Sequence, residues 1–163
     1  MGVFPDSGGP PRAPKPRRVS LGGGASAPYP VPSSEAATTK GRANRRTDTK
    51  PERLLRSSLH RRGLRFRKDL LVKFEGGRTH PDIVFTRAGV VVFVDGCFWH
   101  RCPQHGSTPK SNADYWVPKL EANVDRDRRV DAALVSDGWT VIRIWEHEDP
   151  DEAATRVESA VRR

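Results

Sequence analysis

Apolar residues recur at helical spacing directly after residue 50. The positions that set this spacing are Leu54, Leu55 and Leu59. Gly63 follows them and ends the predicted helix. Residues 49–52, Thr-Lys-Pro-Glu, fit a capping box at the start of the helix, with Glu52 as the acid of the first turn. A structural role as a cap is therefore sufficient to explain Glu52 by itself.

Apolar stretches between residues 64 and 94 predict strands. Residues 64–69 and 70–74 predict one strand or a pair of strands, and the two glycines at 76–77 predict the turn after them. Ile83–Phe85 and 90–94 then flank a turn that contains glycine. Their β-branched residues around that turn predict a β-hairpin.

Two carboxylates lie at the ends of this hairpin, because Asp82 opens it and Asp95 closes it. Opposed residues of antiparallel strands lie roughly 4.5–5.5 Å apart, so Asp82 must lie close to the step from Val94 to Asp95. A three-residue loop at 87–89 would place Asp82 opposite Val94 and turn Asp95 to the other side of the sheet. A loop one residue longer, or a bulge, would make the two carboxylates face each other.

Either arrangement concentrates oxygen ligands and negative charge at one place, which a hard divalent cation would offset. Mg²⁺ is favoured, since it takes one or two carboxylates and keeps its waters for a phosphate substrate. The second oxygen at the metal is then either the carboxylate of Asp95 or the backbone carbonyl of Val94. The alternative is that Asp82 and Asp95 are surface acids that flank a turn.

The C-terminal half predicts a helix, a strand and a helix in that order. A helical region begins at 112–116, is interrupted by Pro118 and continues over 120–135. Residues 139–145, WTVIRIW, alternate and are β-branched, which predicts a strand. A second cap sequence at 149–152 begins a C-terminal helix. The whole order predicts an α/β fold, a mixed β-sheet flanked by helices.

The first fifty residues differ in composition from the rest of the chain. Eight of the fourteen prolines and a run of three glycines lie before residue 35. Because such a segment buries too little apolar area to fold, we expect a disordered tail over 1–33. Residues 34–49 predict a basic arm that contacts DNA, with a solvated linker as the alternative. The basic residues of this arm are Lys40, Arg42, Arg45 and Arg46.

The net charge is +9, from 29 Lys and Arg against 20 Asp and Glu, and it divides unevenly. Residues 1–50 hold nine basic and three acidic residues, a net of +6, which leaves +3 for the rest. A basic arm of this kind points to a polyanionic partner and to salt-dependent binding. No run approaches the roughly 20 apolar residues of a membrane span, and the first residues lack the apolar core of a signal peptide. A cytoplasmic protein is therefore the expectation.

Soft metal ligands cluster directly after the hairpin. Cys97, Cys102 and His105 lie within nine positions, and His147 could provide a fourth ligand from across the sheet. Two cysteines at this spacing in a cytoplasmic chain favour metal binding over a disulfide. Two Cys and two His form the pattern of a structural zinc site, which would pin the loop to the sheet. Buried free cysteines are the alternative.

His100 lies beside the carboxylates and outside this ligand set. A histidine there could activate water or protonate a leaving oxygen in phosphodiester hydrolysis, and a polar loop residue without chemistry is the alternative. The aromatic residues nearby are Phe98, Trp99, Tyr115 and Trp116. Aromatic side chains can wedge between base steps, at least cost where the pair is already mismatched, whereas core packing explains any one of them singly.

Four segments in order resemble the very-short-patch-repair mismatch endonucleases. They are VDGCFWH with the cysteine that follows, NADYW, NVDRDRR and WTVIRIWEH, and the resemblance runs from about Ser34 to His147. It implies a restriction-endonuclease-like fold and an enzyme that nicks one DNA strand beside a T·G mismatch left by deamination of 5-methylcytosine. It also implies Mg²⁺ for cleavage, a structural zinc, and aromatic residues inserted next to the mismatch.

By position, the resemblance makes Asp82 the carboxylate that binds Mg²⁺ and His100 a catalytic histidine. Glu52 would hold a metal-bound water, and Val94 would contribute its carbonyl. Asp95 stands where some members have a histidine, and it is a further catalytic candidate. The zinc ligands would be Cys97, Cys102, His105 and His147. The residues on the DNA side would be Phe98, Trp99, Trp116 and Asn123, together with Arg126, Arg128 and Arg129.

The leading hypothesis is a Mg²⁺-dependent DNA endonuclease that nicks at T·G mismatches, with residues 50–163 as its endonuclease domain. We expect a cytoplasmic, nucleoid-associated monomer that acts on double-stranded DNA, with mismatch-repair proteins as candidate partners. Two alternatives stay open. One is a nuclease of the same fold with another duty, such as restriction or phage-DNA cleavage, and the other is a zinc-stabilised DNA-binding module without catalysis.

Overall fold

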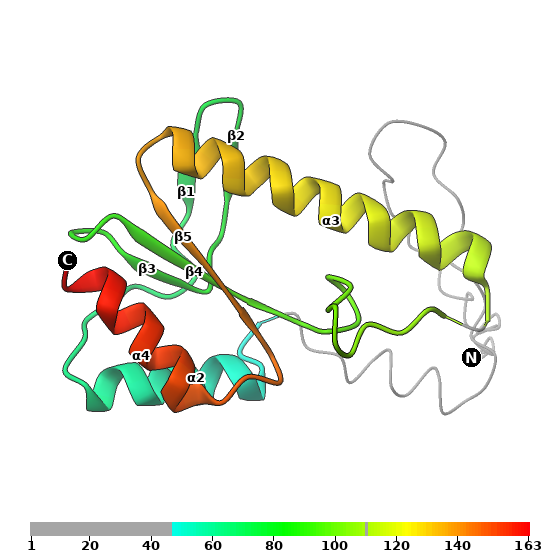
Figure 1. Ribbon diagram of the computed structural model, residues 1–163. Coiled ribbons are helices and arrows are strands. Elements are labelled where there is room, and N and C mark those ends of the chain that lie inside the picture. Colours follow the sequence, from blue (N-terminus) through cyan, green and yellow to red (C-terminus); the bar gives the residue numbers. More distant parts are fainter. Residues whose placement is uncertain (1–46, 110) are drawn as a thin grey trace, which may run out of the picture. The chain divides into compact units, whose positions relative to one another are not determined.

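A sheet of three strands in the order β3-β4-β5 lies at the centre of the protein (Figure 1). The computed structural model describes residues 47–109 and 111–163, all of which belong to one compact unit, Pro32–Arg163. Its elements are α2 (Lys50–Arg61), β1 (Val72–Phe74), β2 (Gly77–Thr79), β3 (Ile83–Phe85), β4 (Val90–Asp95), α3 (Ala113–Ser136), β5 (Thr140–Trp145) and α4 (Pro150–Val161).

Several sequence predictions fall outside the described ranges. They concern the tail at 1–33, most of the arm at 34–49, and Arg42, Arg45 and Arg46 within that arm. Within the described ranges, none of the helices has the length and apolar character needed to cross a membrane.

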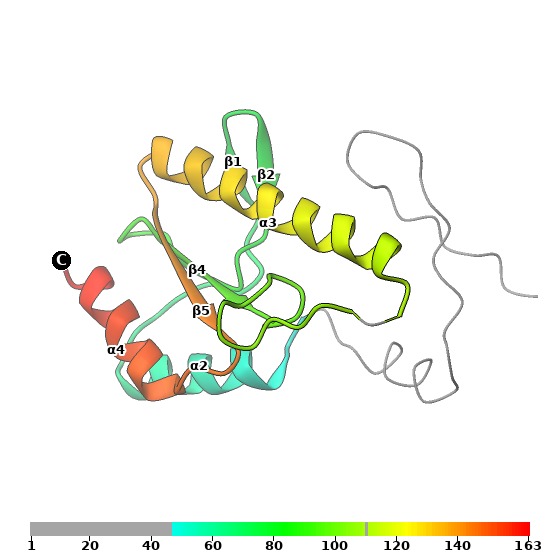
Figure 2. The same cartoon turned by 45° about the vertical axis from the view of Figure 1, so that its right-hand side comes forward.

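Different helices cover the two faces of the central sheet (Figures 1 and 2). On one face, α2 and α4 pack through a continuous apolar core. Its buried members are Leu55, Leu59, Leu64, Ile83, Phe85, Val90, Val92, Ile144, Ala153, Ala154 and Val157. On the opposite face, Leu134 of α3 packs with Val84, Val91 and the β1 residue Val72. The prediction of a mixed sheet flanked by helices is confirmed.

β4 is the middle strand, and its two neighbours run in opposite directions. β3 pairs with it antiparallel, with Ile83 opposite Val92, whereas β5 pairs with it parallel, with Val92 opposite Ile142. Parallel neighbours need a long crossover connection, and α3 provides it. This crossover brings the loop after β4, the start of α3 and the end of β5 to one end of the sheet.

The β3–β4 hairpin has a four-residue loop, 86–89, so the three-residue loop considered from the sequence is wrong. Gly89 ends the loop in the left-handed conformation, with φ of +64°. Continued by one residue, the register places Phe93 opposite Asp82. Asp95 lies two residues beyond Phe93, so it falls on the same side of the sheet as Asp82.

A smaller hairpin of β1 and β2 precedes the central sheet. The two strands pair antiparallel around a turn in which Gly76 takes φ of +83°. Of the one strand or pair of strands predicted over 64–74, the structure has one, β1, because within 64–69 Arg67 forms only an isolated bridge to Val84. Asp69 has a positive φ of 48°, which interrupts the extended backbone before β1 begins.

α3 runs through Pro118 without interruption, contrary to the sequence prediction. Proline has no N–H and removes one helical hydrogen bond. Pro118 lies in the second turn of the helix and is exposed, so the loss is confined to a region near the helix start. Leu120 and Leu134 beyond it are buried, and their packing fixes the helix.

Both short helices begin at an acidic side chain. The carboxylate of Asp149 accepts hydrogen bonds of 2.9 and 3.0 Å from the N–H groups two and three residues later, as predicted for α4. At α2, the buried Glu52 accepts from the N–H of Asp48 and from the hydroxyl of Thr49. Glu52 thus stabilises the start of the helix. The hydroxyl of Thr49 donates a hydrogen bond, whereas in a capping box it would accept one from a backbone N–H.

Candidate active site and metal centre

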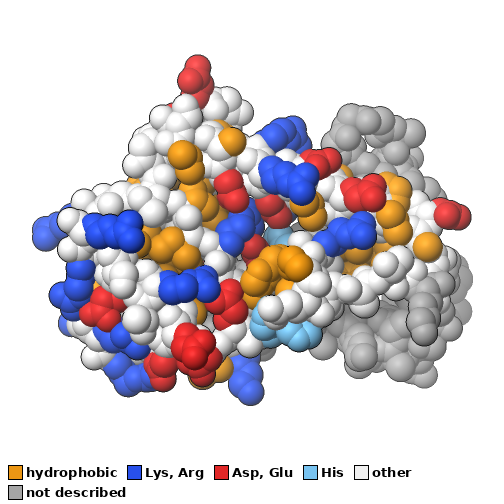
Figure 3. All heavy atoms as spheres, in the orientation of Figure 1, with side chains coloured by type: hydrophobic (Ala, Val, Ile, Leu, Met, Phe, Trp, Pro, Cys, Tyr) orange, Lys and Arg blue, Asp and Glu red, His pale blue; other side chains and the backbone are white. Residues whose placement is uncertain are grey.

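The polar residues of the site gather where β4 ends and α3 passes over the sheet. β4 ends at Asp95, a series of turns over 97–105 follows it, and β5 ends beside it at Trp145. In the space-filling view, acidic and basic side chains lie side by side near the centre of the face, next to hydrophobic and histidine side chains (Figure 3). This part of the surface therefore combines charged side chains with apolar ones.

Asp82 lies against the end of β4. Its Oδ2 accepts a hydrogen bond of 2.7 Å from the backbone N–H of Val94. Burial raises the pKa of Asp82 to about 6, although the bond from Val94 acts in the opposite direction. The charges of three carboxylates also contribute to this rise, namely Glu52, Asp95 and Asp69. Asp82 thus stands where negative charge accumulates, which a cation would relieve.

Asp95 is almost fully buried, and Arg143 occupies both of its carboxylate oxygens. The Nη1 of Arg143 lies 2.8 Å from each oxygen. Arg143 reaches Asp95 from the neighbouring strand β5, two residues before the end of that strand. Such pairing satisfies a buried carboxylate, which would otherwise be costly. Of the two oxygens that the sequence left open as a second metal ligand, the Asp95 carboxylate is already engaged.

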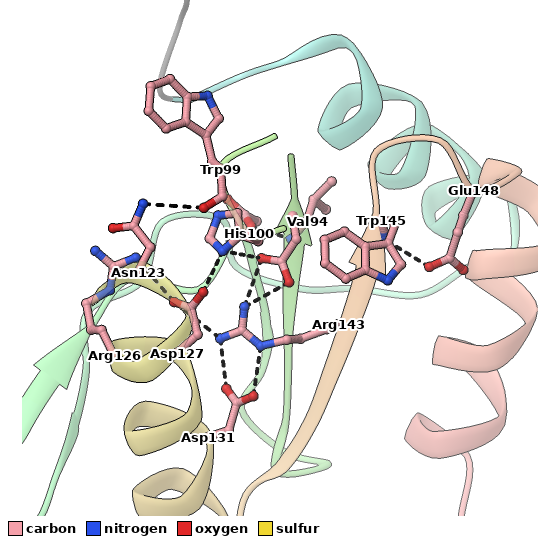
Figure 4. A network of polar contacts seen from close by, with 12 residues as sticks. Val94, Trp99, His100, Asn123, Arg126, Asp127, Asp131, Arg143, Trp145 and Glu148 are labelled. Carbon is pink, nitrogen blue, oxygen red and sulfur yellow. Dashed lines mark hydrogen bonds and ion pairs between the residues drawn. The ribbon is translucent and has the colours of Figure 1, made fainter. Parts of the chain in front are cut away.

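His100 lies between two carboxylates (Figure 4). Its Nδ1 is 2.5 Å from Oδ2 of Asp127 on α3 and 3.6 Å from Oδ1 of Asp95. Burial alone would raise the pKa of Asp127, but His100 lowers it through its hydrogen bond and its charge. The charges of Arg143 and Arg126 lower it further, so the pKa of Asp127 lies below its usual range. Asp127 is therefore an ionised partner that orients the imidazole of His100.

Glu52 approaches the site from α2. Besides its bonds at the helix start, its carboxylate lies 3.3 Å from the guanidinium of Arg56. Its charge also raises the pKa of Asp82, which indicates that the two carboxylates are near each other. Glu52 therefore combines a structural contact with an electrostatic influence on Asp82.

The four predicted zinc ligands come together in one group. One donor atom from each of Cys97, Cys102, His105 and His147 lies within 4.8 Å of the others. Nδ1 of His147 is 3.1 Å from the sulfur of Cys97 and 3.8 Å from that of Cys102. Bonds of about 2.0–2.3 Å in a tetrahedron separate donor atoms by roughly 3.3–3.8 Å, so this group fits a zinc ion.

The two thiols of this group are free cysteines and form no disulfide. Burial, together with the neighbouring Cys102 and Glu146, raises the pKa of Cys97 to about 11. A bound metal ion reverses this order, because a coordinating thiol is deprotonated outright. The set of donor atoms therefore favours one metal ion that binds all four residues.

Phe98, Trp99 and Trp116 form one aromatic cluster with edge-to-face contacts. The ring centroids of Phe98 and Trp99 lie 5.1 Å apart, and those of Trp99 and Trp116 lie 5.8 Å apart. Tyr115 joins the cluster at 5.1 Å from Trp116. All four rings are partly exposed, and the indole of Trp99 points away from the carboxylates (Figure 4). The cluster thus joins the loop after β4 to the first turn of α3.

Asn123 links the same loop to α3, because its side-chain amide donates to the carbonyl of Trp99 at 3.4 Å. Three arginines lie on the following turns of α3 and are exposed, namely Arg126, Arg128 and Arg129. They contact groups of their own helix. Arg126 lies 3.2 Å from the carboxylate of Asp127, and Arg128 lies 3.8 Å from that of Asp125.

Sequence reasoning misses three charged residues of this site, Asp127, Asp131 and Arg143. A usable signal is present for each of them. Arg143 interrupts an otherwise apolar and aromatic face of its strand, and a charge in a buried strand needs a partner. Asp127 and Asp131 lie four residues apart, on one face of the crossover helix that covers this strand.

Known proteins similar to this chain fall in one family. The family model for the DNA mismatch endonuclease Vsr matches residues 34–105. The type II nicking enzyme V.NaeI of Lentzea aerocolonigenes is 50% identical over 134 residues, which cover 82% of this chain and 81% of that protein. The type II nicking enzyme V.XorIIP of Xanthomonas oryzae pv. oryzae is 47% identical over 115 residues, covering 68% and 79%. The DNA mismatch endonuclease Vsr of Escherichia coli is 36% identical over 100 residues, covering 61% and 62%.

These similarities confirm the resemblance carried by the sequence motifs. The family model spans the first helix, the hairpin and the first three residues of the Cys/His group, and V.NaeI extends the similarity over most of the chain. They also decide between an enzyme and a DNA-binding module without catalysis, in favour of the enzyme. The chain belongs to the Vsr family and is a DNA endonuclease, a hydrolase of phosphodiester bonds.

Proposed function

We propose that this chain nicks one strand of duplex DNA beside T·G mismatches, in repair of deaminated 5-methylcytosine. The observation that supports this best is that Asp82 and His100 both lie near Asp95 at the end of β4. Asp82 accepts a hydrogen bond from the N–H of Val94 and is influenced by the charge of Asp95, whereas His100 is bonded to Asp127 and lies 3.6 Å from Asp95. A partly exposed aromatic cluster extends from the same loop. The residues proposed to cleave the phosphodiester and those proposed to contact the bases therefore belong to neighbouring segments of the chain.

Asp82 and the backbone carbonyl of Val94 are the proposed Mg²⁺ ligands. The raised pKa of Asp82, about 6, reflects burial and neighbouring negative charge that a cation would compensate. Asp95 is the weaker candidate, because Arg143 holds both of its oxygens at 2.8 Å. When bound, the ion supplies positive charge that stabilises the scissile phosphate as negative charge develops on it.

His100 is the proposed group that exchanges a proton with the attacking or the leaving oxygen. Its Nδ1 is bonded to Asp127, which leaves Nε2 as the nitrogen for the substrate. An ionised carboxylate behind an imidazole fixes its tautomer and stabilises its charged form. Glu52, whose charge reaches Asp82, is the proposed residue that orients water at the site.

Phe98, Trp99 and Trp116 are proposed to wedge between bases at the mismatch. Opening a base step costs a few kcal/mol, and the cost is least where pairing is already weak. Asn123 would hold this wedge in place through its bond to the carbonyl of Trp99. A T·G pair would be selected because it yields to the aromatic residues more readily than a matched pair.

Cys97, Cys102, His105 and His147 are proposed to hold a structural zinc ion. The ion would join the loop after β4 to the segment after β5. Trp99 and His100 lie between the two cysteines in the sequence. When bound, it supplies a fixed crosslink where the loop has little apolar core of its own. Removal of zinc would therefore loosen the residues that contact DNA.

The remaining parts of the proposal concern the whole molecule. We infer a restriction-endonuclease-like fold for residues 50–163, a DNA-contacting arm at 34–49 and a separate tail at 1–33. We also infer a cytoplasmic enzyme that acts as a monomer on double-stranded DNA. The strongly basic composition of the first fifty residues supports the arm.

A second candidate function is strand nicking at a matched DNA sequence. It is favoured by the names of two relatives, since V.NaeI and V.XorIIP are called type II nicking enzymes. The chemistry at Asp82 and His100 would be the same in both cases. Only the substrate separates the two functions.

Nicking of end-labelled duplexes decides between them. One set carries T·G in varied flanking sequence, a second carries each of the other mismatches, and a third is fully matched, all with Mg²⁺. We expect a single nick in the strand that holds the mismatched T, with matched DNA cut at least about 100-fold more slowly, which corresponds to roughly 2.7 kcal/mol of discrimination. Equal cleavage of matched and mismatched DNA would reject the mismatch function and support the second candidate.

A further inference from the structure

Arg143 occupies the centre of the charged cluster, in the middle of β5. Its side chain is only 23% exposed. One nitrogen, Nη1, lies 2.8 Å from both oxygens of Asp95. Its Nε and Nη2 lie 2.8 and 2.9 Å from the two oxygens of Asp131, and Nη2 is 3.7 Å from Oδ1 of Asp127. One guanidinium thus connects β4, β5 and α3 through three carboxylates (Figure 4).

The same network ends at the imidazole of His100. Asp127 offers one oxygen to Nδ1 of His100 and turns its other oxygen toward Arg143. Asp95 also lies near this nitrogen, at 3.6 Å. His100 therefore has two carboxylates within reach of one N–H, and Arg143 is bonded to the one that His100 does not use.

Arg143 is also the principal cation inside the cluster. Burial would lower the pKa of Arg143, but its bonds to Asp131 and the charge of Asp95 raise it, so the guanidinium stays charged. Arg126 contacts Asp127 as well, yet its side chain is 56% exposed and is screened by water. Without Arg143, three partly or fully buried carboxylates would repel one another beside His100.

We propose that Arg143 is a positioning residue for the cleavage reaction. Its guanidinium occupies Asp95 and steadies Asp127. His100 therefore keeps its Nδ1 on Asp127 and presents a fixed Nε2. This inference rests on the proposed role of His100 in DNA cleavage, and it assigns Arg143 no contact with the substrate.

The first test compares Arg143→Gln with a matched control, Arg62→Gln. Arg62 is 29% exposed and bonds Glu158 at 2.9 Å, on the α2–α4 side of the sheet. With T·G duplex and Mg²⁺, we expect Arg143→Gln to lower kcat about 100-fold with KM changed less than about twofold, because misplacement of a catalytic group by about 1 Å has such an effect. Arg62→Gln loses a similar ion pair, and its kcat should stay within about twofold of the wild type.

A second variant removes the competing carboxylate as well. In Asp95→Asn with Arg143→Gln, the surplus negative charge beside His100 is gone. We expect this double variant to recover about tenfold in kcat over Arg143→Gln alone. No recovery would overturn the inference that Arg143 acts by occupying Asp95.

A readout independent of cleavage is the ¹⁵N shift of the two imidazole nitrogens of His100, measured at one pH in the full chain supplied with zinc. The wild type should show Nδ1 as the protonated nitrogen, and Arg143→Gln should show a mixture. If wild-type protein nicks no DNA, the proposed function fails and the nitrogen shifts alone decide the role of Arg143. If it does nick, both the fall in kcat and the change in shift are required, and either one without the other overturns the inference.

Discussion

The two faces of the central sheet are built on opposite principles. Toward α2 and α4, the face is a continuous apolar core, and apart from the buried Glu52 at the start of α2, charged groups such as Asp151 and Glu158 lie at its margin. There, Asp151 and Glu158 accept hydrogen bonds from Ser58 and Arg62 respectively, which lower their pKa values. Toward α3, carboxylates lie inside the molecule, and burial raises the pKa of Asp82 to about 6.

This contrast separates the part of the molecule that mainly stabilises the fold from the part to which we assign the proposed cleavage chemistry. Ion pairs between exposed acids and arginines add little to the stability of the fold, and they cost little free energy of desolvation. The buried acids at the end of β4 lower the stability of the fold, because each loses its hydration. Each also needs a neighbouring cation, without which the other carboxylates repel it. Such repulsion favours the binding of a cation, in accord with the proposed Mg²⁺ site, and the apolar α2–α4 face compensates for its cost to folding.

The largest effect should follow from loss of the zinc ligands beside the charged cluster. Cys102→Ser removes one of the two thiolates of the group, and structural zinc sites of this kind contribute on the order of 10 kcal/mol of binding free energy. We expect zinc content, measured by elemental analysis, to fall from about one equivalent to nearly none, with nicking lost. Ser107→Ala, an exposed neighbour in the same loop, is the control. A variant that keeps its zinc and its activity would show that these residues do not hold a metal.

The next effect concerns the apolar face. Leu59 is fully buried between α2 and the sheet, whereas Leu54 on the same helix is 45% exposed. Leu59→Ala should lower the free energy of unfolding by about 2–5 kcal/mol through lost burial and a cavity, and Leu54→Ala by less than about 0.5 kcal/mol. Urea unfolding measures both. Similar losses in the two variants would contradict the assignment of stability to this core.

Asp82 provides a pH-dependent test of the charged side. Its pKa is about 6 in the folded chain, against 3.8 for an aspartate exposed to water, so between these values the folded chain holds a proton that the unfolded chain has lost. The stability of the wild type relative to Asp82→Asn should therefore fall by roughly 3 kcal/mol as the pH rises from about 4 to about 6, and stay level above that. Urea unfolding of both proteins from pH 4 to 8, without added Mg²⁺, measures the difference. Parallel curves would mean that the pKa of Asp82 does not differ between the folded and the unfolded chain.

The smallest effect is expected at the cap of α4, to which we assign no role in DNA cleavage. Asp149 accepts two backbone hydrogen bonds at the helix start. Asp149→Ala should lower stability by about 1 kcal/mol and leave nicking of T·G duplex unchanged at temperatures where the protein is folded. Thermal unfolding and the nicking assay check the two parts. A loss of activity without a loss of stability would show that the two faces are coupled.

The two faces also differ in how far the sequence predicts them. The apolar spacing of α2, the hairpin strands and the caps are local patterns, and they predict most of the α2–α4 face. The grouping of Cys97, Cys102 and His105 with His147 is also predicted, from their spacing and from the place of His147 just after a strand, and the structure joins them because β5 ends beside β4. These features depend on spacing within a few residues or on one strand pairing.

The charged network depends on packing that spacing does not determine. Arg143, Asp127 and Asp131 meet only because α3 crosses over the sheet at one rotation about its axis. Pro118 suggested a break in that helix, and a broken helix would have placed Asp127 elsewhere. The sequence does not determine the length of the hairpin loop either, and this length decides whether Asp82 and Asp95 lie on the same side of the sheet.

Mg²⁺-dependent nicking by Asp82→Ala tests the central claim, that the Asp82 carboxylate, which lies against the end of β4, binds the catalytic metal ion. The assay uses end-labelled T·G duplex, with wild type and variant matched for zinc content and for the circular dichroism of the folded state. The account predicts a single nick by the wild type that requires Mg²⁺, and a rate at least about 1,000-fold lower for the variant. Nicking by Asp82→Ala at the wild-type rate would contradict it.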